Sequence, residues 1–430
     1  MKTYIYPNKS QLAEIVARPV FENNFLKEKV SAVLQDVKQN GDAAVKKYTA
    51  QFDGVNLENI AVTKQEIEKA ETLVPVELQN AIKAAAKNIR TFHEAQIQQP
   101  KIVETQAGIE CWRKAVCIEK VGLYIPGGTA PLFSTVLMLA IPAKIAGCSE
   151  IVLCSPPDKN GKLHPAIIYA ANLVGVTKIF KTGGVQAIGA MAYGTETIPK
   201  AYKIFGPGNQ YVTCAKQLVQ EDSVAIDMPA GPSEVCVLAD ETANAVYAAS
   251  DLLSQAEHGA DSQVILVTDS KDLLEKTQLE VERQLNDLPR KSIAEKALEH
   301  SKLILVKNMD EAIAMANEYA SEHLIISCKN ADEVAEKIIN AGSVFIGNYS
   351  PESVGDYASG TNHTLPTNGY ARAYSGVGVD SFVKMITFQK LTQQGLQQIS
   401  QTVITMAEAE ELRAHANAVR YRSEKIEDRN

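Results

Sequence analysis

The feature that most constrains the fold is an alternation of short apolar runs with helical patterns, which begins near residue 122. It opens with "VGLYIPGG" and the helical "PLFSTVLMLAIPAKIAG", and it continues through "EIVLCSPP" and "KIFKTGG". Apolar runs of strand length that alternate with helices are typical of a parallel sheet. A second alternating set runs from a helix at 243–257 to "SVFIG". The sequence therefore predicts an α/β fold with two Rossmann-like, incomplete parallel sheets.

Four parts of the chain follow from this pattern. We expect residues 1–24 to form a small helical extension, and residues 378–430 to form another that starts with the strand-like "SFVKMITFQKL". Residues 122–234 are expected to form one Rossmann-like domain. Residues 25–121 read as mostly helical, and we expect them to complete a discontinuous Rossmann-like domain with residues 235–377.

The composition excludes several classes of partner. The formal net charge is -8 and the chain has no basic tract, so neither a nucleic acid nor a membrane surface is expected as a partner. No run approaches the roughly 20 apolar residues of a membrane span, and the N-terminus lacks the apolar stretch of a secretion signal. Seven scattered cysteines without a CxxC pair fit free thiols in a reducing compartment. We therefore expect a cytoplasmic protein with a small-molecule ligand.

Three glycine-containing turns follow candidate strands of the first sheet: "IPGGTAP" (125–131), "KTGGVQA" (181–187) and "FGPGNQ" (205–210). Open α/β sheets bind ligands at the carboxyl ends of their strands, and glycine lets a phosphate approach a helix N-terminus closely. None of the turns is GxGxxG. Nucleotide binding and mere tight packing of helix on strand stay equally open. The aperiodic segment 348–376 is long enough that we expect it to be ordered and to line a site.

Polar residues also stand at two junctions between a helix and a strand. Gln255 and His258 are three residues apart and share one face at the end of a helix. Glu322 and His323 directly precede an apolar strand, where an adjacent acid and imidazole could divide proton transfer. A solvated helix end is the simpler alternative in both places.

A metal site is a further possibility. Together with Asp356 and His415, the pair Gln255 and His258 would offer two imidazole nitrogens and two side-chain oxygens, which suits Zn²⁺. Their spacing cannot bring them together, and the chain has no compact motif such as HExxH. Composition alone does not select this set.

Several long blocks, in order, resemble the histidinol dehydrogenase family: "VGLYIPGGTAPLFSTVLMLAIPAKIAGC", "KIFGPGNQYVT", "IDMPAGPSEV", "DLLSQAEHGADSQVILVT", "SEHLII" and "NYSPESVGDYASGTNHTLPT". The resemblance extends from about residue 25 to the C-terminal helix. It implies the last step of histidine biosynthesis, in which L-histidinol is oxidised through L-histidinaldehyde to L-histidine in two NAD-dependent steps. It also implies a homodimer with shared active sites and one Zn²⁺ per subunit.

The resemblance further implies a role for individual residues. His323 would take the alcohol proton, and Glu322 would activate water onto the aldehyde. The implied zinc ligands, which also belong to the substrate site, are Gln255, His258, Asp356 and His415, the last from the partner subunit. The other implied substrate contacts are Ser233, His323 and Glu410, and the implied NAD contacts are Tyr124, Gln186 and Asn209.

Two rival functions remain at this point. A zinc hydrolase would use the same metal ligands with Glu322 as its base, but it would leave the glycine turns without a role. A nucleotide-binding module without catalysis would leave Glu322 and His323 unexplained. We assign His363 to the lining of the site without a direct role, and we expect His93, His164 and His300 at the surface.

Overall fold

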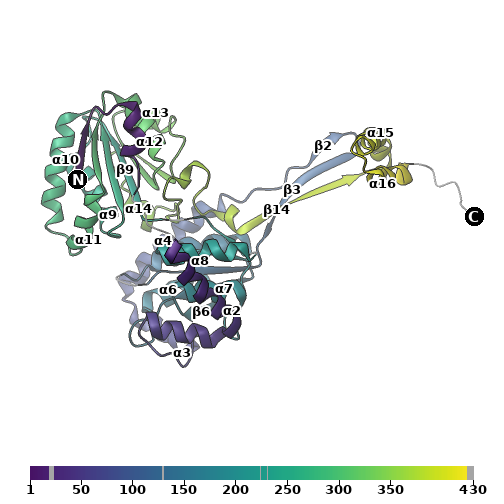
Figure 1. Cartoon of the computed structure of the whole chain (residues 1–430), viewed down its shortest axis with the longest axis horizontal. Coiled ribbons are helices and arrows are strands. Elements are labelled where there is room, and N and C mark those ends of the chain that lie inside the picture. Colours follow the sequence, from purple (N-terminus) through teal and green to yellow (C-terminus); the bar gives the residue numbers. More distant parts are fainter. Residues whose placement is uncertain (19–23, 128–129, 223, 230, 424–430) are drawn as a thin grey trace, which may run out of the picture. The chain divides into compact units, whose positions relative to one another are not determined.

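The computed structural model describes residues 1–18, 24–127, 130–222, 224–229 and 231–423 (Figure 1). The chain divides into two compact units. The first comprises residues 1–96 and 118–382, and the second comprises residues 97–117 and 383–430. Within the described residues, no helix combines the length and the apolar character needed to cross a membrane.

The first unit contains a six-stranded parallel sheet in the order β1-β11-β10-β9-β12-β13. Its strands are β1 (Lys2–Ile5), β9 (Glu234–Ala239), β10 (Gln263–Thr268), β11 (Lys302–Leu305), β12 (His323–Ser327) and β13 (Ser343–Ile346). On one face of the sheet, an apolar core includes residues of α9 (Ala245–Ala256), α10 (Lys271–Leu285) and α11 (Lys291–Glu299). On the other face, a second apolar core includes residues of α1 (Leu12–Ile15), α12 (Met309–Tyr319) and α13 (Ala331–Ala335). Because helices cover both faces, the central strands are continuous apolar runs, as predicted.

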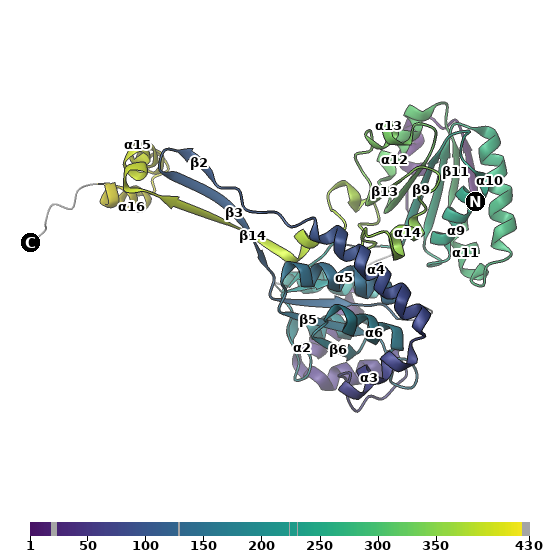
Figure 2. The same cartoon turned by 180° about the vertical axis from the view of Figure 1, so that it is seen from behind.

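A five-stranded parallel sheet in the order β6-β5-β4-β7-β8 forms the other half of this unit. Its strands are β4 (Lys120–Tyr124), β5 (Glu150–Ser155), β6 (Lys178–Lys181), β7 (Lys203–Phe205) and β8 (Ala225–Ile226). The helices between them are α5 (Phe133–Ala146), α6 (Pro165–Val174), α7 (Gly184–Tyr193) and α8 (Gln210–Glu221). Figure 1 labels α7 and α8, and Figure 2 shows α5 and α6 from behind. The chain runs outward from β4 in both directions, so the strand order reverses there, as at a ligand-binding switch point. The two predicted parallel sheets are confirmed.

The helices before residue 97 pack differently from our expectation. We expected residues 25–121 to accompany residues 235–377. Instead, α2 (Asn24–Phe52) packs on α7 and α8, α3 (Lys64–Leu73) on α6, and α4 (Val76–Glu94) on α5. Small residues of α7 allow this close approach, since a Cβ added at Gly189 would lie 3.2 Å from Leu34. An amphipathic pattern reveals an apolar face but not the surface that covers it.

The N-terminal extension also differs, because it is not wholly helical. Residues 2–5 form β1, an edge strand paired in parallel with β11. The segment contains Thr3, Tyr4 and Ile5, which are residue types that favour strands. The short η1 (Lys9–Gln11) and α1 follow, and residues 19–23 of the predicted extension lie outside the described residues.

The second unit consists of a three-stranded antiparallel sheet and two helices. The strands β2 (Val103–Gln106), β3 (Ile109–Cys117) and β14 (Val383–Leu391) lie in the order β14-β3-β2, and α15 (Gln393–Ala409) packs on α16 (Arg413–Ser423). The predicted strand followed by helices is confirmed. Of the apolar residues described in this unit, Ile109, Ala407 and Ala416 are buried, so the unit has almost no core of its own.

The predicted site-lining segment at 348–376 is ordered. It contains α14 (Glu352–Tyr357) and η2 (Tyr370–Arg372), and η3 (Val379–Phe382) follows it. Asn362, Thr364 and Thr367 are buried. These polar side chains place part of the segment in the interior of the first unit, while other residues such as Tyr349 are exposed.

Candidate active site

A pocket of about 1230 Å³ lies where the two parallel sheets of the first unit approach each other. The amino ends of β9 and β12 contribute Ser233, Glu322 and His323, and the turns after β4 and β7 contribute Pro126 and Asn209. The site therefore joins the amino edge of one sheet to the carboxyl edge of the other. Seven residues implied by the resemblance line this pocket: Asn209, Ser233, Gln255, His258, Glu322, His323 and Asp356.

Gln255 occupies the last turn of α9, and His258 follows directly after the helix. The backbone N–H of His258 donates to the carbonyl of Gln255 at 3.2 Å, which closes the helix end. The side chain of Gln255 is fully buried, yet neither its Oε1 nor its Nε2 has a hydrogen-bond partner among the described residues. Leaving a buried polar group unsatisfied costs roughly 1–3 kcal/mol, so this amide is placed for a bound group. The solvated helix end is thereby excluded for Gln255.

Asp356 lies in α14 and lines the same pocket as the strand residue His323. Its Oδ1 lies 3.3 Å from Nε2 of His323, as an ion pair without the alignment of a hydrogen bond. Burial disfavours the charged form of Asp356, but the charge of the nearby His323 outweighs burial and lowers the pKa of Asp356. The carboxylate is thus ionised at neutral pH.

Glu322 and His323 stand at the start of β12, where both side chains are buried. Glu322 accepts a hydrogen bond of 2.9 Å from the backbone N–H of Glu234. Nδ1 of His323 lies 3.2 Å from the carbonyl oxygen of Glu234, and since a carbonyl only accepts, Nδ1 carries the proton. The other nitrogen, Nε2, is left to exchange a proton within the pocket.

Burial and mutual charge shift the pKa values of this pair. Burial raises the pKa of Glu322 to about 8. Burial alone would lower the pKa of His323, but the carboxylates of Glu322, Asp356 and Glu352 overcome it and raise that pKa to about 10. Such perturbed groups in one pocket are typical of an active site.

The donor set in this pocket fits a zinc ion in part. Gln255, His258 and Asp356 line one pocket, and Gln255 and Asp356 each present an oxygen without a hydrogen-bond partner in the described structure. An amide oxygen, an imidazole and a carboxylate are all ligands that Zn²⁺ accepts. The described residues hold no group of three or more His, Cys, Asp and Glu suited to a metal. The three side chains of the first unit could thus hold a metal ion only together with a further ligand.

Two other implied residues belong to the second unit. Glu410 is the residue at which α15 ends, and His415 lies in the first turn of α16. Both side chains are exposed in that unit. The lining of the pocket described above comes from the first unit alone, so the first unit by itself assembles only part of the sequence-predicted set.

The implied cofactor residues follow three strands of the five-stranded sheet. Tyr124 ends β4, and its hydroxyl accepts a hydrogen bond of 3.2 Å from the N–H of Gly184 at the start of α7. Gln186 lies one turn into α7 and is buried, and its Oε1 has no partner among the described residues. Asn209 caps α8 and accepts from the N–H groups of Tyr211 and Val212. Tyr124 and Gln186 thus lie together, while Asn209 lies at the large pocket.

The three glycine turns pack closely against neighbouring residues. A Cβ added at Gly127 or at Gly183 would lie 2.2 Å or 2.4 Å from a side-chain carbon of Pro156, and one at Gly206 would lie 2.1 Å from the carbonyl oxygen of Tyr124. Glycine is therefore required in each turn for close packing. Gly128 and Thr129 of the first turn lie outside the described residues.

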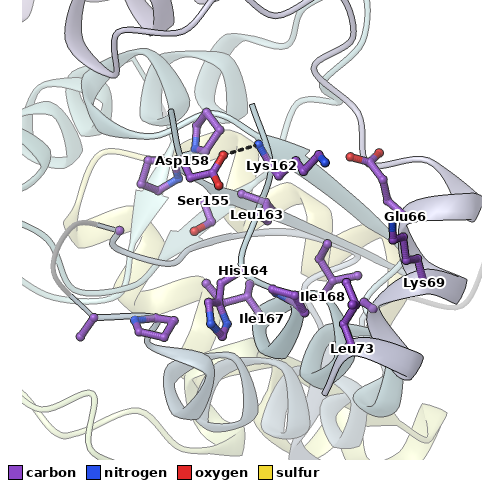
Figure 3. A pocket seen from close by; sticks show the side chains of 17 residues that line it. Glu66, Lys69, Leu73, Ser155, Asp158, Lys162, Leu163, His164, Ile167 and Ile168 are labelled. Atoms are coloured by element: carbon purple, nitrogen blue, oxygen red, sulfur yellow. Dashed lines mark hydrogen bonds between the residues drawn. The ribbon is translucent and has the colours of Figure 1, made fainter. Parts of the chain in front are cut away.

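A second pocket of about 400 Å³ opens beside the first of these turns, between α3, α6 and the loop at Asp158 (Figure 3). In that loop, the backbone N–H of Lys162 donates a hydrogen bond to the side chain of Asp158.

His363 lines the pocket as predicted, whereas sequence reasoning missed Glu352, and both residues hold the site together. His363 donates through Nδ1 to the carbonyl of Asp356 at 2.8 Å, and its Nε2 lies 3.1 Å from Oγ1 of Thr135. Glu352, which is buried, accepts a hydrogen bond from Ser254 and so joins α14 to α9. Glu352 stands one helical turn before Asp356, a spacing that the sequence shows but that has meaning only once Asp356 is known to face the site.

Comparisons with known proteins agree with one another. The family model described as histidinol dehydrogenase matches residues 16–423 of this chain. A histidinol dehydrogenase of Bacteroides fragilis is 64% identical over 426 residues, which cover 99% of this chain and 100% of the relative. One of Haemophilus influenzae is 51% identical over 99% of this chain and 100% of the relative. A crystal structure of histidinol dehydrogenase from Elizabethkingia anophelis is 57% identical, covers 98% of each chain and superimposes with a TM-score of 0.96.

Proposed function

This chain belongs to the histidinol dehydrogenase family, and from that premise we propose that it oxidises L-histidinol to L-histidine through L-histidinaldehyde, with NAD as electron acceptor and Zn²⁺ in its site. It is thus an oxidoreductase of histidine biosynthesis. The similarity over the full length of the relatives gives no support to a zinc hydrolase.

One observation carries the proposed site: Gln255 is fully buried with both amide atoms unsatisfied in the described structure, in the same pocket as Asp356, Glu322 and His323. A purely structural glutamine would pair its amide with the backbone. An amide and a carboxylate that both lack donors beside a buried acid and imidazole instead suit a cation and a polar substrate.

The proposed mechanism assigns proton transfer to two side chains. When bound, Zn²⁺ would hold the nitrogens of the substrate in place, and NAD would accept a hydride in each of the two oxidations. His323 would take the alcohol proton at Nε2 in its neutral form, whose share rises as the pH approaches its pKa of about 10, because Nδ1 is engaged with the carbonyl of Glu234. Glu322 would then take a proton from the water that adds to the aldehyde, and its raised pKa of about 8 places it near the pH at which it must exchange protons.

The second unit supports a homodimer as part of the proposal. Its exposed apolar side chains include Ile102, Val103, Met385, Met406, Leu412 and Tyr421. A group of exposed apolar residues around an almost absent core is typical of a surface that a partner covers. Since Glu410 and His415 lie in the same unit, we propose that a second copy of the chain supplies them to the pocket.

The cellular location and the roles of the two domains are also part of the proposal. All seven cysteines are free thiols, which supports a cytoplasmic location. We also propose that residues 122–234 form the NAD-binding domain, because Tyr124, Gln186 and Asn209 lie at the five-stranded sheet. Residues 235–377 would form the core of the catalytic domain, because the residues at the amino edge of the six-stranded sheet would contact the substrate.

The experiment that tests this function is an assay of the zinc-loaded protein with L-histidinol and NAD, followed at the absorbance of NADH. We expect two NADH for each L-histidinol consumed and loss of the signal after removal of the metal with a chelator. Consumption of substrate without NADH would instead indicate a hydrolase. No turnover by a folded, zinc-loaded sample would refute the proposed reaction.

A further inference from the structure

The end of α2 brings an unassigned carboxylate to the implied cofactor residues. Asp53 follows directly after α2, within the stretch "TAQFDG". Its Oδ2 lies 3.5 Å from Nε2 of Gln186. One turn earlier, Oγ1 of Thr49 lies 3.5 Å from Oγ1 of Thr182, and both threonines are fully buried. The end of α2 is therefore held against the turn before α7, and Asp53 stands beside Tyr124 and Gln186.

Asp53 lacks a partner that would satisfy its charge. Within the part of the chain that the structure describes, its side-chain hydrogen bond is the long contact with Gln186, and no described ion pair includes it. Burial, with no opposing cause, raises the pKa of Asp53 to about 6. A half-buried carboxylate without a cation or short hydrogen bonds is costly unless a ligand brings donors to it.

Acceptors outnumber donors around Asp53. The Oε1 of Gln186 is buried and has no partner among the described residues. The N–H of Gly184, the first of α7, already donates to the hydroxyl of Tyr124. A phosphate brings only negative charge and acceptors, so Asp53 would repel it from this helix end. A ribose brings two hydroxyl donors and no charge, and it fits the group of acceptors.

The order of the strands indicates which end of a dinucleotide reaches Asp53. Hydride transfer requires the nicotinamide at the large pocket, where Asn209 follows β7. Gln186 follows β6, at the opposite edge of the sheet from β7 and β8. A dinucleotide that lies across the carboxyl ends of the strands, as in other open α/β sheets, therefore places its adenosine half near β6.

We propose that Asp53 binds the ribose of the adenosine half of NAD through its hydroxyls and makes this enzyme prefer NAD over NADP. The inference rests on the proposed use of NAD. In dinucleotide-binding folds an acidic residue of the sheet commonly binds the ribose 2′-hydroxyl. Here β5 ends in Ser155, and a carboxylate from outside the sheet takes that role. NADP carries a phosphate on the same hydroxyl, and like charges at close range oppose its binding.

The test is equilibrium binding of NAD and of NADP to the zinc-loaded protein by titration calorimetry, together with kcat/KM for both. For Asp53→Asn we expect a Kd for NAD at least about tenfold higher and an NAD-to-NADP preference at least about tenfold smaller. Glu58→Gln is the matched control, because Glu58 is an exposed carboxylate in the same connection between α2 and α3, and it should match wild type.

Asp53→Glu is the second variant, which keeps the charge but moves it by one methylene. It should weaken NAD binding while still rejecting NADP, and it remains informative if Asp53→Asn does not fold. If both variants fold and keep the wild-type preference, Asp53 is only an electrostatic partner of α7 and the inference is wrong. If the wild-type protein itself neither binds NAD nor reduces it, the proposed use of NAD fails instead.

Discussion

His323 is held through Nδ1 and by a neighbouring aromatic ring, which determines where it can exchange a proton. Nδ1 is engaged by the carbonyl of Glu234, and Nε2 faces Asp356 at 3.3 Å. The same ring lies against Phe345, with centroids 5.9 Å apart. The orientation of the imidazole is thus fixed before substrate arrives, which is the arrangement expected of a general base.

Replacing His323 by Asn should remove proton transfer without removing the metal. We expect kcat to fall by roughly 10²–10⁴-fold, the usual contribution of a general base, while zinc content measured by atomic absorption stays near wild type. His164→Asn is the control, since His164 is an exposed N-cap of α6 and Asn also caps helices well. Loss of zinc in the His323 variant would make this residue a ligand and contradict its assignment.

The raised pKa values make stability depend on pH. The pKa of His323 is about 10 in the folded protein against 6.5 for the free side chain, so the folded state binds more protons between these values. Glu322, raised to about 8 from 4.5, acts in the same direction. The free energy of unfolding should therefore fall as pH rises from about 6.5 to about 10. In metal-free protein, Tm should fall over this range, and less steeply in His323→Asn; equal slopes would contradict the assigned pKa values.

The location of a single residue could be predicted from the sequence where the residue belongs to a recognisable motif. Glu322 and His323 were identified by their adjacency before an apolar strand, whereas His93 was expected at the surface and is fully buried, with Nδ1 bonded to the carbonyl of Ile89. Nε2 of His93 lies 3.4 Å from Nδ2 of Asn362. Asn362 belongs to a segment distant in sequence, and only the fold reveals a partner of that kind. His164 and His300 are exposed, as predicted.

Individual elements are fixed by buried polar contacts as well as by apolar packing. Lys216 of α8 and Asp227 after β8 form a buried ion pair. Nζ of Lys216 also donates to the carbonyl of Gly206 at 2.9 Å, and Oδ2 of Asp227 accepts from the N–H of Gly206 at 2.8 Å. The pair thus holds the turn that leads to Asn209.

Breaking this pair should destabilise the first unit strongly. Lys216→Met leaves Asp227 charged and buried without its cation, which costs roughly 3–5 kcal/mol. Lys38→Met is the control, because Lys38 pairs with Asp222 in an exposed contact of 3.3 Å and should cost no more than about 1 kcal/mol. Urea denaturation measures both. Similar losses in the two variants would show that the buried pair does not hold the turn.

The elements themselves were predicted more reliably than their neighbours. The central strands of the two parallel sheets were marked by continuous apolar runs such as "EIVLCS", because a strand covered on both faces has no polar side. The helices α2 to α4 were also visible as patterns. Their partners were not, since the fit of Leu34 against Gly189 depends on three-dimensional shape.

At the scale of the whole molecule, we propose that the site is built from two copies of the chain. The first unit holds Gln255, His258 and Asp356, and the second holds His415 and Glu410. The resemblance to the family implied that His415 comes from the partner subunit. Spacing and periodicity could not indicate this, because residues that would meet from two chains have no recognisable relation within the sequence of one chain.

Mixing two inactive variants tests the shared site. His258→Ala and His415→Ala should each be inactive alone. After unfolding and refolding together in equal amounts, about half of the dimers should be mixed, each with one intact site, so activity should recover to about a quarter of wild type. Refolded wild-type protein is the reference. If the mixture stays inactive while the reference recovers, each site is built from a single chain.

The pairing of β3 with β14 bears on how the protein is made. The two strands run antiparallel from Cys117 opposite Val383 to Ile109 opposite Leu391. During translation β3 leaves the ribosome early, but its partner is synthesised only after both parallel sheets are complete. Until then the edge of β3 that faces β14 is unpaired, and such an edge favours aggregation. The second unit must therefore assemble last, so a nascent or truncated chain can have both sheets folded and still lack the residues that a partner needs.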